Sequence, residues 1–67
     1  MKVFAERLKE LRTEENLSTR ELAKRVGVTN MAICRWEREE RVPSFENAVA
    51  IAKYFKVSTD YLCGLED

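Results

Sequence analysis

Apolar residues recur at helical spacing along most of the chain. Phe4, Leu8 and Leu11 lie at positions i, i+4 and i+7, so they form one stripe along a helix expected over about residues 2–14. The chain has only two glycines, one proline and no run of β-branched residues, so strands are not expected. Helical segments are also expected at about residues 18–27, 30–39, 44–55 and 58–64. The pattern therefore predicts a compact all-α bundle of five short helices.

The later helices begin and end at residues that are suited to capping. Ser18 precedes Glu21 by three positions, which is the spacing of a capping box at the start of the second helix. Gly27 is expected to end that helix in the left-handed conformation that glycine tolerates best. The remaining expected caps are Thr29, Ser44 and Ser58 at helix starts and Gly64 at the end of the last helix.

The inward faces of these helices predict the hydrophobic core. Trp36 lies beside Ile33 on the inward side of the third helix, which favours a core position over stacking on single-stranded nucleic acid. Val28 is expected to close the turn before that helix. The other residues expected to face inward are Leu22, Ala23 and Val26 in the second helix, Ala32 in the third, and Phe45, Ala48, Ile51, Ala52 and Phe55 in the fourth.

The composition argues against several classes of site. The chain has 67 residues and therefore holds one domain, with two cysteines and no histidine. Cys34 and Cys63 do not have the spacing of a zinc site and are expected to be free thiols in a reducing compartment. A glycine-rich phosphate loop and a Cys–His pair are also missing, so the sequence indicates no enzyme and no metal or cofactor site.

Charge and hydropathy limit the location and the partners. Charged residues interrupt the first ten positions, so no signal peptide is indicated, and no apolar run is long enough to span a membrane. A complete cytoplasmic protein is expected. The 12 basic and 12 acidic residues balance, which argues against a general polyanion binder. Residues 1–42 hold ten basic and eight acidic residues, so an anionic partner is expected there.

A three-residue turn separates the second and third predicted helices. It consists of Gly27, Val28 and Thr29, and such a turn is typical of a helix-turn-helix unit whose second helix enters the DNA major groove.

The outward face of the third helix carries residues that can read base edges. Asn30 can bond adenine, Arg35 can bond the O6 and N7 atoms of guanine, and Met31 can meet a thymine methyl group. Cys34 shares this face. A solvated helix face is the simpler interpretation of Asn30 and Arg35, but it fits Met31 and Cys34 poorly.

The sequence resembles the Cro/cI-type helix-turn-helix domains, also called the xenobiotic-response-element family, over about residues 4–65. The matching features are the Leu-Ser start of the second helix, Glu-Leu-Ala, the Val-Gly-Val-Thr turn, Ile33, Arg35-Trp36-Glu37, Pro43-Ser44 and the final Tyr-Leu-x-Gly-Leu. The resemblance implies a lambda-repressor-like fold with its motif at about residues 18–37. It also implies a sequence-specific regulator of transcription in a bacterium or phage. Such a regulator is usually a dimeric repressor that binds double-stranded DNA at a near-palindromic operator.

Contacts to DNA phosphates are expected on both sides of the third helix. Thr19 and Arg20 begin the second helix, where free N–H groups favour a phosphate. Arg38 and Arg41 follow the third helix. The sequence departs from the family pattern here, because Glu39 and Glu40 stand where a glycine is common.

The resemblance also implies a structural ion pair between Arg12 and Glu37, which would tie the first helix to the third. These two residues are not expected to contact DNA.

The apolar residues near the C-terminus suggest a dimer interface. We expect part of this set to form a twofold contact, at least on DNA. The set consists of Tyr54, Tyr61, Leu62, Cys63 and Leu65.

One further interpretation stays open. The same bundle can serve as a protein-interaction module, such as an antitoxin that masks a toxin. The zero net charge and the acidic C-terminal part are compatible with a protein partner.

Overall fold

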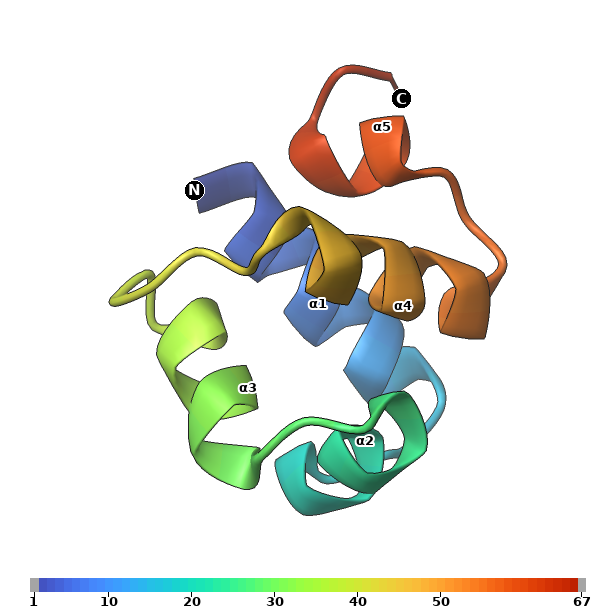
Figure 1. Ribbon diagram of the computed structural model, residues 1–67. Coiled ribbons are helices and arrows are strands. Elements are labelled where there is room, and N and C mark those ends of the chain that lie inside the picture. The colour runs from blue at the N-terminus through green and yellow to red at the C-terminus, as the bar shows by residue number, and fades with distance from the viewer. Residues whose placement is uncertain (1, 67) are drawn as a thin grey trace.

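The computed structural model describes residues 2–66, which form five α-helices and no strands (Figure 1). The helices are α1 (Lys2–Glu14), α2 (Thr19–Val26), α3 (Asn30–Glu37), α4 (Phe45–Phe55) and α5 (Thr59–Cys63). The prediction of an all-α bundle of five helices is confirmed. The third helix ends two residues earlier than predicted, at Glu37, because Glu39 adopts a left-handed conformation with φ 63°.

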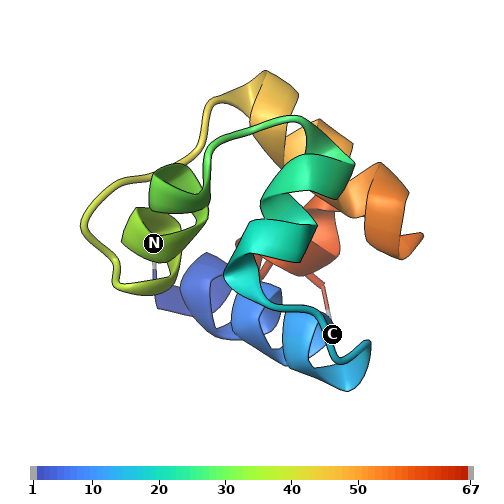
Figure 2. The ribbon, with the colours of Figure 1, turned by 90° about the horizontal axis from the view of Figure 1, so that it is seen from below.

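The helix-turn-helix unit forms one end of the bundle. In Figure 1, α2 and α3 lie at the lower end, while α5 and both chain ends lie at the upper end. Seen from below in Figure 2, α2 and α3 lie nearest the viewer, with α1 along one edge and α4 along the other. The end of the molecule that carries α2 and α3 is therefore clear of the chain termini.

Local capping explains where α2 begins and ends. The Ser18 hydroxyl accepts a hydrogen bond from the backbone N–H of Glu21 at 3.1 Å, and the Glu21 carboxylate accepts one from the N–H of Ser18 at 2.9 Å. This is the predicted capping box. Gly27 ends the helix with φ 78°, a conformation that costs most side chains steric energy. The predicted N-caps of α3, α4 and α5 are likewise confirmed, as Thr29, Ser44 and Ser58.

One core joins all five helices. Trp36 is buried as predicted, and its ring and that of Phe4 pack in a T-shaped arrangement with a centroid distance of 6.3 Å and an interplanar angle of 73°. The prediction for Phe45 is wrong: this first residue of α4 is 78% exposed. The largest fully buried side chains are Phe4, Leu8, Leu22, Ile33, Ile51 and Leu62.

The predicted dimer face is only partly available. Leu62 has no exposed surface, so it lies outside the part of this set that can form a twofold contact. Tyr61 packs under the guanidinium of Arg7, which lies 4.2 Å from the ring centroid and also donates hydrogen bonds to the carbonyls of Tyr61 and Glu66. These contacts bind α5 to α1. Leu65, in contrast, is 77% exposed.

A largely buried ion pair connects α1 to α3. The Nε and one Nη atom of Arg12 donate to the two carboxylate oxygens of Glu37, at 2.7 and 2.9 Å. The other Nη atom donates to the carbonyl of Leu17 at 2.8 Å. The hydrogen bond to Glu37 raises the pKa of Arg12, although burial opposes this shift. All three guanidinium nitrogens of Arg12 therefore donate a hydrogen bond in a place that is largely shielded from water.

We expect the capping box to make stability depend on pH. Hydrogen bonds from Ser18, chiefly the one from its backbone N–H, lower the pKa of the Glu21 carboxyl below its ordinary value. A carboxyl with a lowered folded-state pKa stabilises the fold above its unfolded-state pKa, and this contribution is lost as the pH falls through the folded-state pKa. Urea unfolding of the wild type and Glu21→Gln should therefore differ at neutral pH and converge in acid. A difference that does not change with pH would contradict this assignment.

We expect removal of one partner of the ion pair to be costly. Arg12→Ala leaves the Glu37 carboxylate buried without its donors, so unfolding should become easier by about 3 kcal/mol. Replacing both groups with apolar side chains, in Arg12→Met/Glu37→Leu, should recover at least half of that loss. Urea denaturation of the three proteins measures both effects. Equal stability of the wild type and Arg12→Ala would show that the pair has no structural role.

Candidate nucleic-acid interface

The turn between α2 and α3 is fixed by hydrogen bonds and by burial. The backbone N–H groups of Gly27 and Val28 both donate to the carbonyl of Ala23, at 2.9 and 3.0 Å. The Val28 side chain is half-buried against the core, and the Thr29 hydroxyl accepts from the N–H of Ala32 at 3.1 Å. The start of α3 therefore has a defined position relative to α2.

The four predicted base-reading residues lie at two different depths. Met31 is 59% exposed and Arg35 is also exposed, so both side chains are free to meet a ligand. Asn30 and Cys34 are half-buried. Helical spacing predicted one shared face for all four, but it did not show that Asn30 and Cys34 lie against α2.

Cys34 contacts polar side chains from both helices. Its Sγ atom lies 3.9 Å from the Oγ1 atom of Thr19 on α2 and 3.9 Å from the Oδ1 atom of Asn30, one turn earlier on α3. Thr19 is half-buried as the first residue of α2. Thr19, which is predicted to bind a phosphate, and Asn30, which is predicted to read a base, thus both contact Cys34.

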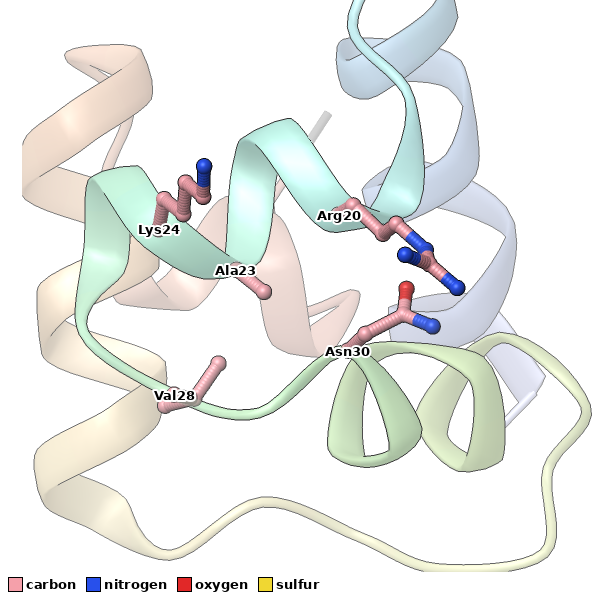
Figure 3. Close-up of a pocket in the computed structure, with 5 residues that line it drawn as sticks. All are labelled: Arg20, Ala23, Lys24, Val28 and Asn30. Atoms are coloured by element: carbon pink, nitrogen blue, oxygen red, sulfur yellow. The ribbon is translucent and has the colours of Figure 1, made fainter.

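A cavity of about 310 Å³ lies between α2 and the start of α3. In Figure 3 the guanidinium of Arg20 and the carboxamide of Asn30 point toward one another at one side of this cavity, and Lys24 stands farther along α2. Lys24 was missed at the sequence level, although its position four residues after Arg20 places both on one helix face. The lining residues are Arg20, Ala23, Lys24, Val28 and Asn30.

Acidic and basic side chains alternate after α3. Arg38 and Arg41, both predicted to contact phosphates, are exposed, and so are Glu39 and Glu40 between them. The N–H of Glu40 donates to the carbonyl of Arg35 at 2.9 Å, so the chain turns tightly at the end of the helix. A phosphate near this turn would meet charges of both signs.

Two further features concern residues 2–66, namely metal-binding groups and membrane-spanning helices. This part of the chain contains no group of three or more side chains suited to holding a metal ion, and both cysteines are free thiols. None of its helices has the length and apolar character needed to cross a membrane.

Comparison with known proteins points to one family. A helix-turn-helix family matches residues 8–62. The transcriptional activator BcrR of Enterococcus faecalis is 38% identical over 64 residues, covering 96% of this chain and 31% of BcrR. Repressor protein C2 of Salmonella phage P22 is 40% identical over 60 residues, covering 90% of this chain and 28% of the repressor. The chain thus spans about a third of the length of these two relatives.

A solved structure agrees with the sequence comparison. The P22 c2 repressor in complex with a synthetic operator superposes with a TM-score of 0.84 and 41% identity, covering 88% of this chain and 89% of that one.

Proposed function

The chain belongs to the Cro/cI-type helix-turn-helix family, and from this membership we propose that it is a sequence-specific regulator of transcription that binds double-stranded DNA. The observation that carries the proposal is the α2–turn–α3 unit, which holds Met31 and Arg35 outward from a helix of fixed orientation. A helix presented in this way fits the DNA major groove. The matching P22 repressor is described in complex with an operator, which supports the same mode of binding.

The proposed base contacts follow from side-chain chemistry. Arg35 presents a planar fork of donors that matches the O6 and N7 atoms of guanine. Met31 has no donor, so an apolar thymine methyl group is its natural neighbour. Asn30 can bond adenine with its carboxamide, although it is less exposed than the other two.

The proposed phosphate contacts lie on either side of α3. Thr19 and Arg20 are in the first turn of α2, where backbone N–H groups are free to meet an anion. Arg38 and Arg41 follow the end of α3 and are exposed. Phosphate contacts of this kind supply most of the affinity and make it depend on salt.

We propose that the regulator acts as a dimeric repressor on a near-palindromic operator in the cytoplasm. Two copies of α3 can enter successive major grooves only if the pairing places them about one helical turn of DNA apart. The exposed apolar side chains available for pairing are Val3, Val42, Phe45 and Leu65. The same exposed side chains keep a protein partner open as the second candidate function.

We expect selection from random duplex DNA to identify the operator. The wild type should enrich a near-palindrome with half-sites about one helical turn apart. Arg35→Ala should lose about 1–3 kcal/mol of binding free energy on that site and relax the preference at one base pair, because a bidentate contact is removed. Lys9→Ala, an equal change of charge on the exposed face of α1, should leave the preference intact. Weak binding with no enriched sequence would contradict DNA reading and favour a protein partner.

We expect Glu39 to weaken DNA binding through its charge and to reduce stability through its backbone. Glu39→Gln should raise duplex affinity at low salt without changing stability, and the gain should shrink as salt rises. Glu39→Gly should raise affinity similarly and also stabilise the fold by about 1 kcal/mol, because glycine tolerates the left-handed conformation. Titrations at two salt concentrations and urea unfolding separate the two effects. Unchanged affinity of Glu39→Gln would show that this carboxylate points away from the DNA.

A further inference from the structure

Cys34 has an unusual place for a residue on a DNA-reading face, because its thiol contacts one side chain of that face, Asn30, and one of α2, Thr19. We propose that Cys34 is a positioning residue, whose thiol holds the Asn30 carboxamide in the orientation that reads a base. This inference rests on the proposed DNA-binding function. It assigns the base contact at this point to Asn30 and not to Cys34 itself.

The first step of the argument is geometric. Asn30 and Cys34 are one helical turn apart on α3, and the Sγ atom lies 3.9 Å from the Asn30 Oδ1 atom. The Thr19 hydroxyl of α2 lies at the same distance on another side of the thiol. Cys34 is half-buried between these partners, whereas Met31 and Arg35 are exposed. A side chain in this place has less access to a ligand than its neighbours on α3.

The second step concerns hydrogen-bonding capacity. The thiol is a weak donor whose one proton can point to the Thr19 Oγ1 or the Asn30 Oδ1 atom, and the Asn30 Oδ1 atom can accept two hydrogen bonds. A bond from the thiol therefore occupies one lone pair and leaves the other, together with both protons on Nδ2, for a base. Adenine needs one acceptor and one donor from a carboxamide, so this arrangement preserves the complete adenine contact.

The third step concerns the freedom of the carboxamide. The terminal torsion of asparagine has a broad energy profile, so an unsupported carboxamide samples many orientations. Two donor groups face the carboxamide of Asn30, namely the Cys34 thiol and the Arg20 guanidinium, which points toward it in Figure 3. Because both groups are donors, they favour the orientation in which the Asn30 carbonyl oxygen faces them, and this orientation leaves Nδ2 free. A contact that is held in place before binding discriminates better than one that must be ordered during binding.

A double-mutant cycle on the selected operator tests the proposal. The cycle compares the wild type, Cys34→Ala, Asn30→Ala and the double variant, each on the operator and on its single-base variants. Cys34→Ala should weaken binding about tenfold in the presence of Asn30 and less than about twofold in its absence. It should also relax the preference at the same base pair that Asn30→Ala relaxes.

Two variants separate positioning from a general loss of structure. Cys34→Ser retains a donor and should restore most of the preference at the Asn30 base pair. Met31→Ala removes an exposed neighbour and should add to Asn30→Ala without coupling, because Met31 reads its base independently. The side-chain NH₂ group of Asn30, observed by NMR without DNA, should become more mobile in Cys34→Ala and not in Met31→Ala.

The outcomes separate a failure of the positioning role of Cys34 from a failure of the proposed DNA-binding function. If the effects of Cys34→Ala and Asn30→Ala add, or if Cys34→Ala relaxes a different base pair, the positioning role is overturned. If the wild type selects no duplex, the proposed function fails and the positioning role falls with it. Coupled losses at one base pair, rescued by serine, support the proposal.

Discussion

The ion pair between Arg12 and Glu37 is the contact on which the orientation of α3 depends. This helix has eight residues, too few to be stable alone in water, so its direction must come from its neighbours. The pair fixes its C-terminal end against α1, and the turn at Gly27 fixes its N-terminal end against α2. Trp36 and Ile33 bury the side between these two ends. A helix held at both ends presents its outward side chains in one arrangement.

The attachment of α3 to α1 and α2 creates two kinds of position on its outward face. Residues at the outermost positions, Met31 and Arg35, are free to adapt to a ligand. Asn30 and Cys34 lie beside α2, where the Cys34 thiol contacts both Thr19 and Asn30. Free side chains lose conformational entropy when they bind, whereas restrained ones have lost it during folding. If Cys34 positions Asn30 as proposed, the face combines adaptable side chains with a preorganised one.

Helix caps, which depend on local chemistry, could be predicted from the sequence. The burial of particular side chains, which depends on how the helices pack, could be predicted only in part. Caps such as Ser18 and Gly27 were predicted because one residue and its near neighbours determine them. Phe45 has the correct helical spacing for the core, but it begins α4 and remains exposed, since periodicity shows direction and not distance from the core. The contacts of Cys34 with Thr19 depend on how two helices meet, which no single-helix pattern records.

The charge balance of the chain favours selective contacts over general attraction to DNA. Twelve basic and twelve acidic residues cancel, so long-range attraction to a polyanion is weak for the molecule as a whole. After α3, Glu39 and Glu40 stand between Arg38 and Arg41. Their charges cancel at a distance, so the two arginines attract a phosphate only when it is close. A protein with little nonspecific affinity must gain its binding energy from correctly placed groups. The rigid attachment of α3 is therefore the physical condition for the proposed sequence-specific binding by so evenly charged a chain.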